Sequence, residues 1–117
     1  MNSLNQARQE VDNNQEYWSL HLMNFVDDFR RHKSVEDISI PFTLTGDRFD
    51  AIFASTAETL CDEASLVPPP WLAEVPGCHD PWFVAGMESL KAIALAESPL
   101  RFRIRKIFVL ENFLTRV

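Results

Sequence analysis

The sequence has few glycines, few cysteines and no long apolar run. Its three glycines exclude the glycine-rich loops with which many nucleotide-binding proteins hold phosphate groups. Its two cysteines, Cys61 and Cys78, are too few for a disulfide framework. No stretch approaches the roughly 18–20 apolar residues of a membrane span, and the first fifteen residues lack the basic start and apolar core of a signal peptide. We therefore expect a cytoplasmic protein that does not associate with membranes.

Motifs that mark catalysis are also missing. The sequence contains no nucleophile elbow, and no histidine stands at the spacing of a general base. The tripeptide Cys78-His79-Asp80 has residue types of a metal or nucleophile site. Adjacent residues rarely converge on one ion, however, and zinc normally takes four ligands at recognisable spacings. The sequence predicts no catalytic residue, no metal site and no cofactor, and it predicts a non-enzymatic protein.

The apolar content favours one helical domain. With 117 residues, 46% of them hydrophobic, the chain can bury a core of its own. Apolar residues recur at helical spacing over residues 4–32, 47–64 and 82–97. We predict a mainly α, compact, single-domain bundle of about four to five helices over residues 1–117, with a Pro-rich crossover and room for one short strand pair.

Two of these helices carry more detailed expectations. The polar Asn13-Asn14-Gln15 interrupts the first helix, so residues 1–15 can form a mobile extension instead of part of one long helix. On the helix over residues 47–64, the polar side chains should lie mostly outward, as charged helix faces usually do: Asp50, Ser55, Glu58, Asp62 and Glu63.

The C-terminal segment combines helix and strand signals. Ser98 is a typical N-cap and Pro99 a typical first helical residue, which predicts a short helix to about Arg105. The apolar residues 107–110 should then be extended. Because a lone strand needs a partner, it should pair either with residues 39–44 or with another chain.

The segment Val67–Phe83, VPPPWLAEVPGCHDPWF, holds five of the seven prolines and two of the three tryptophans. Proline lowers the entropy lost when such a segment is ordered, so residues 67–81 form a stiff crossover. Two interpretations follow for Trp71, Trp82 and Phe83. They can close the core over the helices, or a partly exposed tryptophan can anchor a partner protein.

Charge is unevenly distributed. Residues 1–67 carry twelve acids and five bases, and residues 68–117 carry five acids and six bases, which gives the net charge of −6. The cluster Arg101, Arg103, Arg105 and Lys106 can pair with acids of the same chain, or it can bind an acidic partner or a nucleic acid. If Arg103 and Arg105 face a partner, changing both to alanine should weaken binding with little loss of fold. If they brace the fold, the double variant should unfold.

The last fifty residues carry a resemblance. Successive motifs PPPW, PWF, ESP, FRIRKIFV and NFLTR lie within residues 67–117. This segment resembles the C-terminal part of small bacterial antitoxin-type or transcriptional-regulator-associated proteins, some of which carry a helix-turn-helix domain in front of it. Residues 1–66 show no helix-turn-helix pattern, which disfavours independent operator binding.

The resemblance implies a regulatory protein that acts by masking a partner protein, such as a toxin. Two alternatives remain, a nucleic-acid-associated regulator and an accessory subunit of an enzyme, and a homodimer is also compatible with the sequence. The predicted partner-binding residues are Trp71, Trp82, Phe83, Arg101, Arg103, Arg105 and Lys106.

Overall fold

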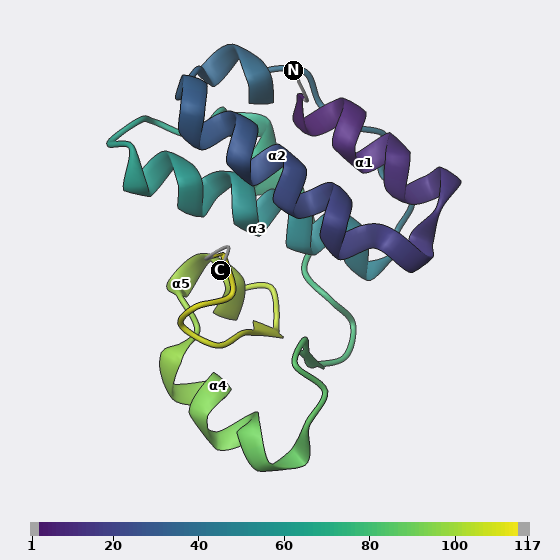
Figure 1. The fold of residues 1–117 in the computed structure, drawn as a ribbon, viewed down its shortest axis with the longest axis vertical. Coiled ribbons are helices and arrows are strands. Elements are labelled where there is room, and N and C mark those ends of the chain that lie inside the picture. The colour runs from purple at the N-terminus through teal and green to yellow at the C-terminus, as the bar shows by residue number, and fades with distance from the viewer. Residues whose placement is uncertain (1–2, 115–117) are drawn as a thin grey trace.

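The computed structural model describes residues 3–114, which form five α-helices and one pair of short strands (Figure 1). This confirms the predicted mainly α fold with one short strand pair. The helices are α1 (Leu4–Asn13), α2 (Trp18–His32), α3 (Arg48–Glu63), α4 (Lys91–Glu97) and α5 (Leu100–Arg103), and the strands are β1 (Trp82–Phe83) and β2 (Ile107–Phe108). Four 3-10 turns connect them: η1 (Gln15–Tyr17), η2 (Val35–Ile38), η3 (Pro70–Glu74) and η4 (Glu88–Leu90).

The first helical stretch is a hairpin, so the prediction of one long helix over residues 4–32 was wrong. Ser3 caps α1 by accepting a hydrogen bond from the Gln6 backbone N–H. The chain leaves helical geometry at Asn14, where φ is −155°, and α2 runs back alongside α1 (Figure 1). Three apolar side chains of α1 are fully buried, so residues 4–13 pack against α2 and α3 and are not an extension: Leu4, Ala7 and Val11.

Helix α3 lies at the centre of the molecule, and its prediction over residues 47–64 is confirmed. Asp47 caps it by accepting the Phe49 backbone N–H at 3.0 Å. The helix is buried nearly all round, because α1 and α2 cover one side and η3 and α5 cover the other. The predicted outward placement is confirmed for Asp62 and Glu63, which are exposed. It was wrong for Asp50, Ser55 and Glu58, since all three are buried.

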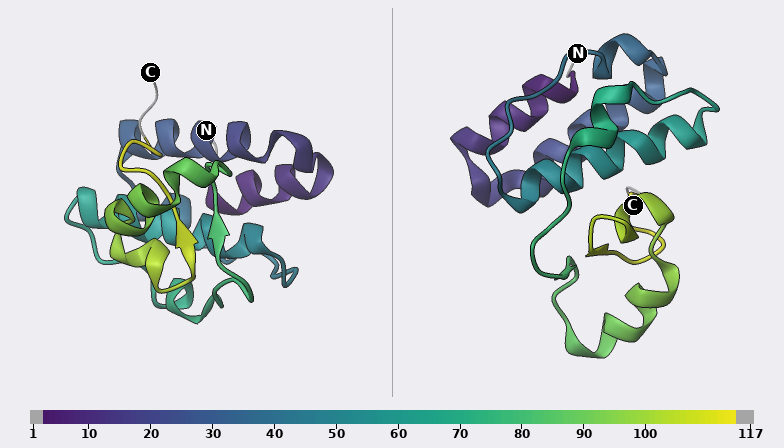
Figure 2. Two further views of the ribbon diagram at one scale, coloured as in Figure 1. Left: turned by 90° about the horizontal axis from the view of Figure 1, so that it is seen from below. Right: turned by 180° about the vertical axis from the view of Figure 1, so that it is seen from behind.

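Beyond the crossover, the C-terminal residues form a smaller lobe beneath the three-helix layer (Figures 1 and 2). Strand β2 is extended as predicted, but the predicted pairing of this strand with residues 39–44 was wrong. Strand β1 pairs with it in parallel, with Trp82 opposite Ile107 and Phe83 opposite Phe108. This pairing keeps Trp82 and Phe83 out of the helix predicted over residues 82–97, and α4 begins only at residue 91.

Gly77 lets the crossover approach the C-terminal segment closely. A Cβ atom at this position would lie 2.6 Å from the Cα of Arg105, closer than real Cβ contacts come. The next residue, Cys78, donates its backbone N–H to the Arg105 carbonyl at 2.8 Å. Glycine therefore allows the contact that begins the pairing between the crossover and the residues before β2.

Candidate functional site

Arg105 is an internal brace, which corrects its prediction as a partner-binding residue. Its side chain is 4% exposed, and its guanidinium pairs with the carboxylate of Glu58, which is 3% exposed. It also donates to the backbone carbonyls of Leu72, at 2.7 Å, and Val75, at 3.2 Å. The planar guanidinium of Arg105 donates in several directions at once, so these bonds join α3, η3 and the C-terminal segment.

The rest of the basic cluster is also largely occupied within the chain. Arg101 donates two hydrogen bonds to Asp62, at 3.0 and 3.1 Å, and this bonding raises the pKa of Arg101. Arg103 donates to the carbonyls of Ser98 and Ala96, both at 2.7 Å, which caps the C-terminal end of α4. Lys106 is exposed and lies 3.4 Å from the carbonyl oxygen of His79. The cluster is thus mainly structural.

The three aromatic residues predicted as anchors are each partly buried. Trp71 donates its indole N–H to the Ile38 carbonyl at 3.0 Å and meets the Phe42 ring edge-on. Phe83 stacks on Phe108 with ring centroids 5.0 Å apart. Trp71 and Trp82 both pack against the core, as the core-closing interpretation predicts.

Trp82 belongs to an aromatic cluster at the edge of the core. Its ring lies 5.3 Å from that of Trp18 and 6.2 Å from that of Phe49, measured between centroids. The guanidinium carbon of Arg48 stands over the indole, 4.4 Å from its centroid. The outer part of this cluster forms one wall of a hollow.

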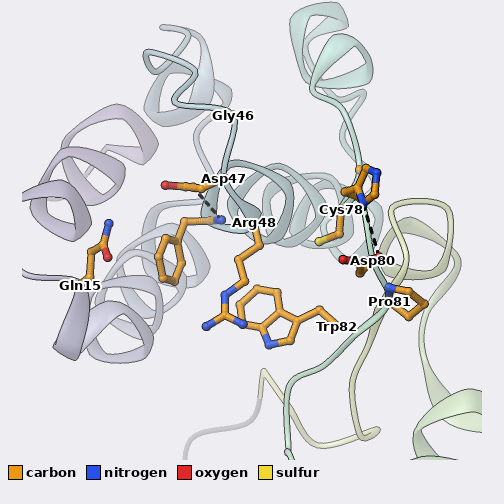
Figure 3. A pocket seen from close by; sticks show the side chains of 11 residues that line it. Gln15, Gly46, Asp47, Arg48, Cys78, Asp80, Pro81 and Trp82 are labelled. Atoms are coloured by element: carbon orange, nitrogen blue, oxygen red, sulfur yellow. Dashed lines mark hydrogen bonds and ion pairs between the residues drawn. The ribbon is translucent and has the colours of Figure 1, made fainter.

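The hollow lies between the start of α3 and the loop 77–82, with a volume of about 560 Å³. Gln15 and residues 46–49 line it from one side, and residues 77–82 line it from the other. Figure 3 shows the Arg48 guanidinium beside the Trp82 indole, between Gln15 on the left and Cys78 and Asp80 on the right. The hollow is open to solvent, and its walls come from segments that lie far apart in the sequence.

The two thiols differ in exposure. Burial raises the pKa of Cys78 above its usual 9.0, although the positive charges of Arg48 and Lys106 act to lower it. Burial also raises the pKa of Cys61 to about 11, with a further increase from the charges of Asp62 and Glu58. Cys61 is fully buried, as expected of a core residue, whereas Cys78 is partly exposed.

These environments predict selective labelling. With iodoacetamide at pH 8, Cys78 should react more slowly than a free cysteine, since its raised pKa leaves less thiolate. Cys61 should react only after the protein is unfolded in urea. Mass spectrometry of the labelled peptides measures both rates, and equal rates for Cys61 and Cys78 in the folded protein would contradict this burial.

Two searches of the described part of the chain were negative. Within residues 3–114, no group of three or more His, Cys, Asp or Glu side chains is arranged to hold a metal ion. Over the same residues, the helices are too short or too polar to cross a bilayer. The Cys78-His79-Asp80 tripeptide therefore belongs to no such group within residues 3–114.

A second surface of interest is apolar and lies on the C-terminal lobe. In α4 only Ala94 is buried, although the helix sequence is KAIALAE. Leu100 and Ile104, one helical turn apart at α5, are 71% and 61% exposed. Five of the ten exposed large apolar side chains of residues 3–114 lie in this region: Met87, Ile93, Leu95, Leu100 and Ile104. We call these five residues the α4–α5 face.

Comparisons with protein families, curated proteins and solved structures found no match to this chain. The resemblance of residues 67–117 to antitoxin-type proteins therefore stays a prediction. Sequence analysis missed both Arg48 and the α4–α5 face. The only available signal for the face was the lack of a charged side on KAIALAE, since an ordinary surface helix has one.

Proposed function

We propose that this protein is a non-enzymatic, cytoplasmic binding module that covers an apolar surface of a partner protein with its α4–α5 face. The observation that supports the proposal is that five of the ten exposed large apolar side chains of residues 3–114 fall within residues 87–104. Single exposed apolar residues are ordinary, and it is where they adjoin one another, as we propose for Leu100 and Ile104, that they mark interaction sites. Each leucine or isoleucine fully buried on docking contributes about 1.5–3 kcal/mol.

This proposal moves the predicted binding surface. The tryptophans and Arg105 stabilise the fold, so the anchors we propose are Leu100 and Ile104. Arg103 lies between them in the sequence, is exposed and has no carboxylate partner among the residues 3–114. It is placed to serve at the polar rim of an interface. The antitoxin-like masking of a toxin is one form that this activity can take.

Nucleic-acid binding receives less support from the same contacts. Arg101 and Arg105 are paired with carboxylates of α3, which leaves Arg103 and Lys106 for phosphate contacts. Two cations are few against a net charge of −6, because an acidic protein repels nucleic acid at long range. We therefore favour a protein partner.

The test changes the proposed anchors and leaves the fold intact. Leu100→Asp and Ile104→Asp should each weaken capture of the partner from the native extract at least about tenfold, because a charge in an apolar contact costs more than 1.4 kcal/mol. Val67→Asp is the matched control, since Val67 is 84% exposed and lies outside the face. It should bind as the wild type does.

Two readouts decide the result. Circular dichroism and thermal unfolding should be unchanged in all three variants, because each site is exposed. Binding that survives both Leu100→Asp and Ile104→Asp would exclude the α4–α5 face as the interface. Sedimentation of the pure wild type shows whether the face is instead covered by a second copy, in which case the two variants would be monomeric.

A further inference from the structure

We propose that the hollow beside Trp82 is a binding site for a small organic carboxylate, held by Arg48. This site is separate from the α4–α5 face and does not depend on the function proposed above. Its central feature is an arginine whose hydrogen-bonding groups are unused.

Arg48 stands apart from the other arginines of residues 3–114. Arg103 donates to two backbone carbonyls. Five other arginines pair with carboxylates: Arg8, Arg30, Arg31, Arg101 and Arg105. Within residues 3–114, Arg48 pairs with no carboxylate and donates no side-chain hydrogen bond, and its guanidinium lies over the rings of Trp82 and Phe49. Its donors are therefore available in a solvent-open hollow.

The rings hold this guanidinium ready for a ligand. Its carbon lies 4.4 Å from the Trp82 centroid and 5.7 Å from that of Phe49. A cation–π contact uses none of the hydrogen bonds of the guanidinium, so its N–H groups stay free to bind a carboxylate, which they do best through two parallel hydrogen bonds. A side chain already held in place loses less entropy when a ligand arrives.

Two carboxylates line the same hollow, and their charges oppose an anion. Asp47 is already engaged, because one of its oxygens accepts from Arg8 at 3.1 Å and from the Phe49 N–H at 3.0 Å. Asp80 is 90% exposed and lies 3.4 Å from the His79 ring, so solvent screens it. The positive charge of Arg48 is therefore paired with neither of the two carboxylates that line the hollow.

The dimensions and walls indicate an organic acid and not a bare inorganic ion. The volume of about 560 Å³ falls in the range of roughly 300–1,000 Å³ found for small-molecule sites. Trp82, Phe49 and Pro81 supply apolar wall, and the Gln15 carboxamide supplies a polar one. A carboxylate attached to a flat apolar body would use both. Such a group can belong to a free small acid or to an acidic side chain of a peptide.

The experiment uses probes that separate these sources. Benzoate, with benzamide as its uncharged match, represents a small acid. A blocked glutamyl dipeptide, with its glutaminyl match, represents a peptide side chain. Each is titrated into the wild type while the indole N–H signals are followed by NMR, and Trp82→Phe assigns the Trp82 signal.

We expect the Trp82 signal to shift saturably with at least one carboxylate probe and not with its uncharged match. Arg48→Gln should weaken that binding at least tenfold, and Arg31→Gln, which removes an exposed arginine elsewhere, should leave it unchanged. The probe that binds more tightly identifies the source. The proposal is overturned if no carboxylate shifts the signal saturably, if the amides bind equally, or if Arg48→Gln binds as the wild type does. None of these results bears on the α4–α5 face.

Discussion

Replacing Arg105 by methionine should lower the free energy of unfolding by about 3–5 kcal/mol, the usual effect of removing one partner from a buried ion pair. Glu58 would keep its charge in a site where its side chain is 3% exposed. The carbonyls of Leu72 and Val75 would also lose their donor. Urea unfolding followed by circular dichroism measures the change.

Two controls make this result specific. Arg101→Met removes a partly exposed arginine that pairs with Asp62 and approaches Glu58, and it should cost about 1 kcal/mol or less. The double variant Glu58→Met with Arg105→Met should recover much of the loss, because it leaves no unpaired charge. If the free energy of unfolding of Arg105→Met lies within about 1 kcal/mol of the wild-type value, the bracing role of Arg105 is excluded. The same reasoning predicts that the double change of Arg103 and Arg105 to alanine unfolds the protein.

Replacing Arg8 by methionine should have a loss of similar size, about 3–5 kcal/mol. Arg8 and Asp50 are each 1% exposed and lie 3.0 Å apart. The same guanidinium reaches Asp12 at 2.7 Å and Thr45 at 2.7 Å. It ties α1 to the start of α3, so the variant tests whether α1 is docked in solution.

Arg31→Gln is the matched control for Arg8, because Arg31 is exposed and its nearest carboxylate, on Asp28, is 3.8 Å away. It should change the free energy of unfolding by no more than about 0.5 kcal/mol. A silent Arg8→Met would mean that the pair of Arg8 with Asp50 does not stabilise the docking of α1 onto α3. Denaturant midpoints of the three proteins, measured under one set of conditions, decide between these outcomes.

Local patterns predicted the elements whose signals are local. The helix over residues 47–64 has an N-cap and an apolar stripe within its own sixteen residues, and both can be read without knowing the fold. The extended residues 107–108 were predicted for the same reason. The interruption at Asn13-Asn14-Gln15 was recognised, but the reversal of the chain there was missed, because helical spacing on both sides of Asn14 does not show the direction in which the second helix runs.

The candidate sites were less predictable, because they depend on which residues meet. The sequence left two roles open for Arg105, an ion pair within the chain and a contact with a partner, because the basic run does not show which acids it meets. Arg48 belongs to no motif of the sequence, and nothing in its neighbourhood along the chain indicates that it meets Trp82. Only the packing of Trp82 against it leaves its guanidinium stacked and otherwise without a partner among the described residues.

From its sequence alone, this protein could be assigned a mainly α fold, a central helix, a stiff Pro-rich crossover and an absence of catalytic motifs. Tertiary structure alone decided which charges became internal and which stayed free. Arg8 meets Asp50 across 42 positions of sequence, and Arg105 meets Glu58 across 47. Periodicity describes one helix at a time, whereas the cost of burying a charge depends on partners that arrive from distant segments.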